Sequence, residues 1–289
     1  MISTKCGAAT DTGLVRRQNE DSLLAQFPLF VVADGMGGHA AGEVASGITV
    51  DSFQELLTSG RSLEVGDLAE TIDAANRRVF ENAASKDSRG MGTTVVGLAL
   101  ISERGQQLWL VFNVGDSRLY RWMDHSLTQV TVDHSEVQEL IDDGSLSSND
   151  ARNHPNRHII TRAIGIEEVV EPDFWLLPAV SGERFLLSSD GLSSEVSDEV
   201  IGSVLAEEPV PEQAAQRLID LALAAGGHDN VTVVVIDVSA DAQSLEDEDT
   251  ARGLNAEQPA NERRVLIDHV PTESFLKGLA EAGDEGGHQ

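Results

Sequence analysis

Short apolar runs that end in an aspartate recur along this sequence, and this pattern constrains the fold most strongly. Phe30–Ala33 leads directly into Asp34, and Phe185–Leu187 leads through two serines into Asp190. Each of these aspartates is followed by a glycine. Apolar runs of this length between turn-forming residues predict buried strands. An acid at the end of such a strand is held by a stiff backbone, which is where a ligand must be positioned.

Further acids lie at the borders of other apolar runs, and these are Glu20, Asp21, Asp116 and Asp229. Acids at the ends of several strands can converge on one place in the fold. Uncompensated carboxylates there would repel one another strongly, and a bound cation relieves that repulsion. Carboxylate ligands without paired cysteines indicate a hard ion such as Mg²⁺ or Mn²⁺ rather than structural zinc. The sequence therefore predicts a divalent cation site.

Six short motifs carry a resemblance to a known family. They are Arg16-Arg17-Gln18-Asn19-Glu20-Asp21, Asp34-Gly35-Met36-Gly37-Gly38-His39, Gly90-Met91-Gly92-Thr93-Thr94, Gly115-Asp116-Ser117-Arg118, Ser189-Asp190-Gly191 and Asp229-Asn230. Their content and order resemble the bacterial metal-dependent serine/threonine protein phosphatases of type 2C. The resemblance covers about residues 5–238. It implies an α+β fold in which a two-sheet antiparallel β-sandwich is flanked by antiparallel helix pairs and carries a flap subdomain.

The resemblance also implies an activity and a metal site. The expected reaction is hydrolysis of phosphoserine and phosphothreonine in proteins, with two Mn²⁺ or Mg²⁺ ions holding a hydroxide that attacks the phosphorus in line. Asp34 is expected to bridge the two metals and the Gly35 carbonyl to complete one shell. Glu20 is expected on one side, with Asp190 and Asp229 on the other. Of the remaining acids, the resemblance places Asp21 behind these ligands or on their waters, and Asp116 with Asp190 at a third metal.

Two further residues are expected to act on the substrate. Arg16 has the family spacing from Glu20 for the arginine that binds phosphate, and a guanidinium can hold two phosphate oxygens at once. Its neighbour Arg17 stays open as the alternative contact. His39 is expected to protonate the departing oxygen, because imidazole titrates near neutral pH. The alternative for His39 is to orient a water on the metal.

Composition limits the partners and the compartment. The 289 residues contain 49 acids and 20 Lys and Arg, a formal net charge of −29. Such a charge argues against binding of nucleic acid or anionic lipid. Cys6 is the single cysteine, no apolar run approaches the length of a membrane span, and the first residues lack the apolar segment of a signal peptide. We therefore expect a soluble, cytoplasmic protein, and we expect it to be a monomer. The resemblance implies phosphorylated proteins as its substrates and a cognate serine/threonine kinase as a partner.

Hydrophobic periodicity predicts the order of elements. Strands are expected at 3–9, 22–33, 94–101, 107–113, 117–122 and 231–238, and helices at 40–57, 65–84, 135–143, 148–152, 197–207 and 211–225. Adjacent helices between runs of strands favour α+β layering. A catalytic domain is expected over 1–240, with the loosely patterned segment at about 133–171 as its flap.

Residues 241–289 carry 12 acids and four bases, which predicts an acidic, flexible tail. One stretch in it, 272–280, has the pattern of a short amphipathic helix. Two roles for the tail stay open. Either this stretch docks on the protein or on a partner, or the tail is inert.

Other chemistries find less support. The sequence contains no Gly-x-x-x-x-Gly-Lys-Ser/Thr loop and no Gly-x-Ser-x-Gly elbow, which disfavours nucleotide binding of the P-loop kind and a serine nucleophile of the hydrolase kind. Two alternative functions remain open. One is a catalytically silent relative that binds phosphoproteins, and the other is a phosphatase of small phosphorylated molecules.

Overall fold

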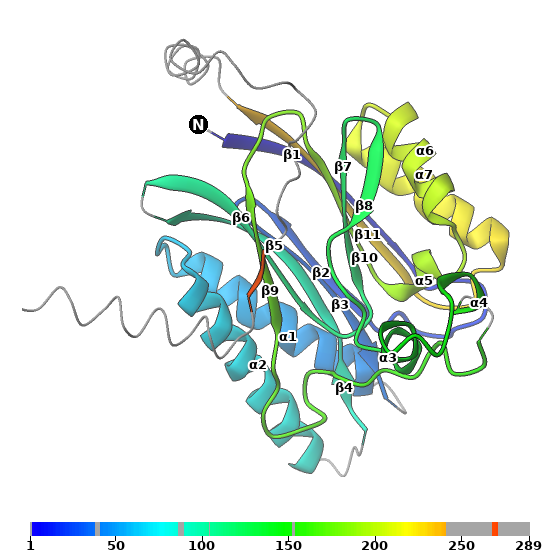
Figure 1. Ribbon diagram of the computed structural model, residues 1–289. Coiled ribbons are helices and arrows are strands. Elements are labelled where there is room, and N and C mark those ends of the chain that lie inside the picture. The colour runs from blue at the N-terminus through cyan, green and yellow to red at the C-terminus, as the bar shows by residue number, and fades with distance from the viewer. Residues whose placement is uncertain are drawn as a thin grey trace, which may run out of the picture.

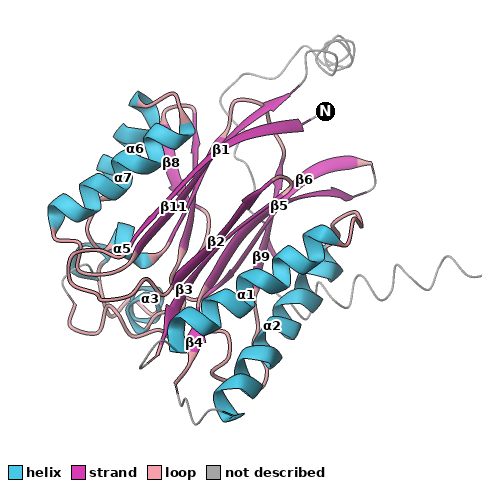
Figure 2. Ribbon diagram, turned by 180° about the vertical axis from the view of Figure 1, so that it is seen from behind, coloured by secondary structure: helices cyan, strands magenta, loops and turns pink. Residues whose placement is uncertain are grey.

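Two β-sheets stacked face to face form the centre of the molecule, and a pair of helices covers each outer face (Figure 1). The structure is a computed structural model of the 289-residue chain. It describes residues 2–37, 41–85, 90–103, 105–151, 154–240 and 268–270. The view from behind in Figure 2 shows the same layers, with the helices outside and the strands inside. This four-layer α-β-β-α arrangement confirms the predicted α+β sandwich.

The first sheet has five antiparallel strands in the order β1-β11-β10-β7-β8. Their bounds are β1 Ile2–Asp11, β7 Arg118–Met123, β8 Ser126–Gln129, β10 Arg184–Ser188 and β11 Val231–Ala240. Val233, Val235 and Val231 on one face of β11 contact the helices, whereas Val234, Ile236 and Val238 point between the sheets. This alternation follows from the two-residue period of a strand.

The second sheet has seven strands, six of them in the order β12-β9-β6-β5-β3-β2, with β4 paired to β3. Their bounds are β2 Asp21–Gln26, β3 Leu29–Met36, β4 Gly92–Thr93, β5 Val95–Glu103, β6 Gln106–Val114, β9 Asp173–Pro178 and β12 Asp268–Val270. Residues 29–33 of β3 are fully buried, because β3 has helices on one face and the other sheet on the opposite face. The predicted burial of this run on both faces is confirmed.

Four long helices form the outer layers. Helices α1 Ala41–Thr58 and α2 Val65–Ser85 cover the second sheet, and α6 Asp198–Glu207 and α7 Pro211–Ala225 cover the first. Three short helices, α3 Glu136–Asp142, α4 Ser148–Ala151 and α5 Asp190–Ser193, lie near the end of the sandwich at which β3 and β10 finish (Figure 1). Pro211 opens α7, where its missing N–H is not needed.

Aromatic pairs join the layers. Trp109 of one sheet and Phe185 of the other meet edge to face, with ring centroids 5.8 Å apart. Phe53 of α1 stacks on Phe112 of β6 at 5.1 Å. All four rings are fully buried, so these contacts fix the spacing of sheet on sheet and of helix on sheet.

Two differences between the structure and the sequence prediction have a direct physical reason. The stretch 22–33, expected as one strand region, forms the antiparallel strands β2 and β3, which turn at Phe27-Pro28. Proline lacks the N–H that a continuing strand would need. Within the expected flexible tail, Asp268–Val270 forms β12 on the edge of β9, because an edge strand offers unpaired backbone groups to an added strand. The expected helix at 272–280 lies outside the described residues.

Among the helices that the structure describes, none is long and apolar enough to span a bilayer.

Gly97 provides a test of the packing between α1 and the second sheet. It lies directly opposite Phe112, and a Cβ at Gly97 would lie 2.0 Å from Cζ of that ring. Gly97→Ala must displace the ring from Phe53, so we expect the free energy of unfolding in urea to fall by about 1–3 kcal/mol.

The control for this substitution is Gly47→Ala in α1, where no described atom lies within 4 Å of the added Cβ. There the greater helix propensity of alanine should raise stability by up to about 1 kcal/mol. Equal unfolding midpoints for the two variants would contradict the packing argument.

Candidate active site

The acids singled out by the sequence lie at one end of the sandwich, on five separate segments. Asp34 lies near the end of β3, and Asp190 opens α5 directly after β10. Asp229 precedes β11, Asp116 lies in the turn between β6 and β7, and Glu20 precedes β2. These five acids line one pocket of about 790 Å³, together with Arg16 and Gly35. The structure thus brings together most of the predicted site residues.

Hydrogen bonds fix the backbone around Asp34 on both sides. The Asp34 N–H donates to Thr94 Oγ1 at 3.0 Å, and the Thr94 N–H donates to the Asp34 carbonyl at 2.9 Å. Thr93 Oγ1 donates to the same carbonyl at 2.8 Å. The two threonines of the Gly-Met-Gly-Thr-Thr motif therefore support the site through the main chain of Asp34.

Gly35 brings the segment of Glu20 against the end of β3. Its N–H donates to the Glu20 carbonyl at 3.1 Å. A Cβ at Gly35 would lie 2.2 Å from the Gly42 carbonyl oxygen and 2.5 Å from that of Glu20. Three backbone segments meet here at a distance that only glycine allows, which explains the Asp-Gly sequence by packing.

Burial and mutual repulsion raise the pKa values of Asp34, Asp116 and Asp21. Desolvation raises the pKa of Asp34 well above its usual value, and Asp21, Asp190, Asp116 and Asp229 raise it further. Desolvation and the neighbouring Asp190 act in the same direction on the pKa of Asp116. Burial raises the pKa of Asp21 to about 7, in spite of hydrogen bonds from Thr232 and Ser189. The site as a whole resists being fully ionised.

Asp21 stands directly across from Asp34 in the β2–β3 pair. The Ser189 hydroxyl donates to Asp21 Oδ2 at 2.8 Å. Asp21 thus links the start of β2 to the residue that precedes Asp190. Asp21 does not line the cavity that Glu20 and Asp34 line, and it contacts the pocket through Ser189.

Arg16 lies at the rim of the pocket, with half of its side chain exposed. Its Nη2 donates to Asp229 Oδ2 at 2.6 Å. Asn230 places this N-terminal segment, because its side-chain amide donates to the carbonyls of Thr12 and Gln18 and its Oδ1 accepts from the Glu20 N–H. The Asp-Asn motif therefore holds Arg16 and Glu20 beside β11. The neighbouring Arg17 is exposed and does not line the pocket.

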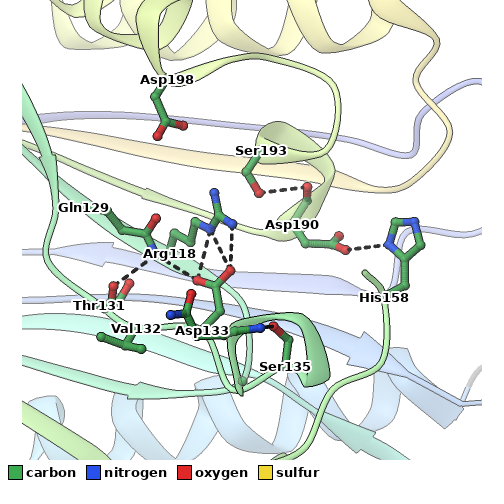
Figure 3. A network of polar contacts seen from close by, with 12 residues as sticks. Arg118, Gln129, Thr131, Val132, Asp133, Ser135, His158, Asp190, Ser193 and Asp198 are labelled. Atoms are coloured by element: carbon green, nitrogen blue, oxygen red, sulfur yellow. Dashed lines mark hydrogen bonds and ion pairs between the residues drawn. The ribbon is translucent and has the colours of Figure 1, made fainter. Parts of the chain in front are cut away.

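The segment expected to be a flap borders the pocket on the other side. His158 Nδ1 lies 3.9 Å from Asp190 Oδ2, as Figure 3 shows, and Arg157 and Ile160 also line the cavity. His158 belongs to the segment at about 133–171 that is expected to be the flap, and the sequence analysis did not single it out. Its nearness to Asp190 depends on how residues 154–160 cross the end of the sandwich, which no local pattern reveals.

A second cavity, of about 650 Å³, adjoins the first and shares Asp116, Arg157 and Asp190 with it. At its base Arg118 binds Asp133 through Nε and Nη2, at 2.7–3.0 Å (Figure 3). Gln129 Nε2 donates to the same carboxylate at 2.8 Å. The arginine of Gly-Asp-Ser-Arg is therefore engaged in a buried structural pair beside Asp116.

The sequence analysis did not single out His134, which positions the loop of Asp116. The Gly115 N–H donates to His134 Nδ1 at 3.0 Å, and Nε2 lies 3.1 Å from Asp173 Oδ2. Nε2 also lies 3.0 Å from Arg162 Nη1, so this ring nitrogen stands between a guanidinium, which donates, and a carboxylate, which accepts. Val130-Thr131-Val132 followed by Asp133-His134 repeats the pattern of an apolar run ending in an acid, and this signal could have found the residue.

The donor set of the pocket fits a hard divalent cation. Oδ1 of Asp116 and Oδ1 of Asp21 are buried without a hydrogen-bond partner among the described residues, and the available donors are carboxylate and carbonyl oxygens. As the side chains stand, no three described His, Cys, Asp or Glu residues form a group that could hold a metal ion. In the described structure Asp229 contacts Arg16, and Asp190 faces His158. His39 lies outside the described residues.

The raised pKa of Asp34 gives a testable dependence of stability on pH without divalent ions. An aspartate in an unfolded chain titrates near pH ~3.9. The folded chain therefore holds its proton to a higher pH than the unfolded chain does, and stability falls as the pH rises above about 4. We expect Asp34→Asn to remove this penalty and to raise the free energy of unfolding at pH 8 in EDTA.

Urea unfolding of both chains at pH 5.5 and pH 8 checks this expectation. The matched control is Asp51→Asn, on the exposed side of α1, which should leave the pH dependence unchanged. A loss of stability at pH 8 in Asp34→Asn would contradict the repulsion inferred for the pocket.

Residues 16–221 match the family described as Protein phosphatase 2C. The serine/threonine protein phosphatase PstP of Mycobacterium tuberculosis is 45% identical to the chain over 236 residues, which are 80% of this chain and 44% of PstP. The chain thus spans less than half the length of that relative. The serine/threonine phosphatase stp of Listeria monocytogenes is 38% identical over 240 residues, which are 79% of this chain and 93% of stp.

A solved structure has the same fold. It contains the catalytic domain of the serine/threonine protein phosphatase PstP in complex with two manganese ions. It superposes with a TM-score of 0.76 at 39% identity, covering 83% of this chain and 100% of that chain. These matches confirm the resemblance carried by the six motifs and the predicted sandwich. The chain belongs to the protein phosphatase 2C family.

Proposed function

We propose that the chain hydrolyses phosphoserine and phosphothreonine in proteins with the help of Mn²⁺ or Mg²⁺. The observation that carries this proposal is the convergence of acids from five segments on one pocket, with an exposed arginine at its rim. Membership of the family and the manganese-bound PstP structure support it. A pocket with this many carboxylates would repel a phosphate dianion unless cations were bound there.

The residues proposed to hold two ions are Glu20, Asp34, Asp190 and Asp229 with the Gly35 carbonyl, and Asp116 with Asp190 is proposed for a third. Asp21 is proposed to act from behind them, through Ser189 and through water. When bound, the ions neutralise the charge of the phosphate and make water reactive at neutral pH.

The chain's own side chains are proposed to bind and orient the substrate. Arg16 has the reach and exposure to exchange Asp229 for two phosphate oxygens, and a guanidinium suits that geometry. We propose His39 as the acid that protonates the departing serine or threonine oxygen, with orientation of a water as its alternative role. Arg157 and His158 border the pocket and would contact the part of the substrate that lies under the flap.

The unit proposed to carry this activity is residues 1–240, with a flap at about 133–171. Lining of both cavities by residues of that flap supports the assignment. Phosphoproteins as substrates, a cognate serine/threonine kinase as partner, a signalling role, a monomeric state and a cytoplasmic location belong to the same proposal. A single cysteine and a net charge of −29 are consistent with it.

Metal dependence gives the first test of the proposed activity. We expect hydrolysis of p-nitrophenyl phosphate and of a phosphothreonine peptide to require added Mn²⁺ and to stop in EDTA. Asp34→Asn should lower kcat by about 100- to 1,000-fold, because metal charge stabilisation is worth several kcal/mol.

Turnover that survives EDTA would contradict this mechanism. Cellular function that survives Asp34→Asn would favour the silent phosphoprotein-binding alternative. Faster hydrolysis of phosphosugars than of phosphopeptides would favour the small-molecule alternative.

The choice between Arg16 and Arg17 gives a second test. Arg16→Ala should lower kcat/KM for the phosphopeptide by about 10- to 100-fold, which corresponds to hydrogen bonds to a charged group. Arg17→Ala is the matched control, because Arg17 is the neighbouring exposed arginine, and it should stay within about twofold of the unchanged chain. The reverse ranking would assign phosphate binding to Arg17.

A further inference from the structure

A cleft with a partly apolar lining lies beside the carboxylate pocket, between the end of the proposed flap and the start of β9. It has a volume of about 530 Å³, within the usual range of ligand pockets. Two of its lining side chains, Ile166 and Val169, are among the exposed large apolar residues, at 45% and 69% exposure. Met36 lines both this cleft and the carboxylate pocket. Neighbouring exposed apolar residues of this kind are typical of a surface that another segment covers.

The register of β12 directs the chain's own C-terminal segment toward this cleft. β12 runs antiparallel to β9, with Asp268 opposite Leu176 and Val270 opposite Phe174. β12 therefore advances along β9 toward Asp173 and the residues before it, and Val169–Glu171 line the cleft. Figure 1 shows β12, drawn in red, beside β9. Pro271 follows and has no N–H to extend the ladder, so the chain is free to leave the sheet edge there.

The next residues are long enough to reach the cleft. Val170 is four residues from Phe174, which corresponds to at most about 14 Å of extended chain. The five residues from Pro271 to Phe275 can span about 17 Å. Phe275 can therefore reach the apolar wall of the cleft while β12 stays paired with β9.

The segment 272–280 also has side chains that suit the cleft. Phe275, Leu276 and Leu279 are spaced so that one face of a helix carries all three. Lys277 is the single lysine or arginine of residues 265–289. The lining of the cleft combines apolar side chains such as Ile166 and Val169 with Thr161, Arg162 and the exposed acids Glu167 and Glu171. Burial of the apolar side chains would drive docking, and the lysine next to these acids would orient the segment.

We propose that residues 272–280 of the same chain dock in this cleft, which is formed by residues 160–171 and Met36. The docked segment borders the carboxylate pocket at Met36 and keeps the cleft from other polypeptides. Docking is a matter of packing alone and does not depend on the proposed catalysis.

Disulfide trapping in the full-length chain tests the proposal. In a Cys6→Ser background, Val169→Cys and Phe275→Cys place one thiol in the cleft and one on the segment. Under mild oxidation with glutathione we expect a disulfide to form within one chain, read by mass spectrometry of the intact, unreduced protein. Circular dichroism checks that each variant folds, and both substituted positions lie outside the proposed catalytic machinery.

The decisive comparison separates docking from mere proximity. The same two cysteines are combined with Leu276→Asp and Leu279→Asp, which keep the tether but remove the apolar contacts. The rate of disulfide formation should fall at least about tenfold, because burial of one leucine side chain changes the docking equilibrium by a factor of that size. Val200→Cys with Phe275→Cys, which moves the partner thiol to an exposed valine of α6, should also trap at least about tenfold more slowly.

Equal trapping rates with and without the aspartates would overturn the proposal. A disulfide between two chains, with a rate that rises with protein concentration, would overturn it in favour of a second copy in the cleft. Absence of any disulfide at Val169→Cys with Phe275→Cys would equally overturn it.

Discussion

Carboxylates held close together at one end of a β-sandwich repel one another, and much of the surrounding structure serves to keep them there. Asp21 and Asp34 stand directly opposite in neighbouring strands, a position in which like charges destabilise a sheet. The charges of Asp190, Asp116 and Asp229 also raise the pKa of Asp34. Such a set persists because the chain around it packs well enough to offset the repulsion, a pattern that is typical of functional sites.

Hydrogen bonds to the backbone, rather than ion pairs with opposite charges, hold the segments that carry these carboxylates in place. Thr94 holds Asp34 from both sides, Asn230 holds the segment of Arg16 and Glu20, and His134 holds the turn of Asp116. Each of these residues bonds to main chain and leaves the carboxylates free to face the pocket. Among the described residues, Arg16 forms an ion pair with the pocket acid Asp229. Because half of the Arg16 side chain is exposed, this ion pair is weak and can be exchanged for another contact.

Further segments, which are not required to form the two sheets, also lie at this end of the sandwich. Residues 157–160 border the pocket, the residues that follow them form the cleft beside it, and β12 adds a strand to the edge of β9. Extra segments near a rigid site can change what reaches it without changing its chemistry. The core beneath them is closed by aromatic contacts between the layers, so such segments can vary at little cost to the fold.

The sequence by itself determined the residue types of the site and most of the elements. Asp34, Asp190 and Asp229 stand where a strand or helix begins or ends because buried apolar runs have abrupt polar borders. Helices α1, α2, α6 and α7 and strands β5, β6, β7 and β11 agree with their periodicity to within two residues. Strands β4, β8, β9 and β12 were not predicted. Three of them have only two to four residues, and the sequence of β9, Asp-Phe-Trp-Leu-Leu-Pro, does not alternate between polar and apolar residues.

Only the tertiary structure decided which polar residues meet. His134 contacts Gly115 across 19 residues, Asn230 reaches Gln18 across 212, and His158 lies near Asp190. Such contacts depend on how the sheets stack, and local propensity contains no information about stacking. The hairpin at Phe27-Pro28 and the pairing of β12 with β9 were decided in the same way. The sequence specified which groups were available for chemistry, and the packing of two sheets against each other fixed their positions, because long-range burial rather than local pattern sets the distances between strand ends.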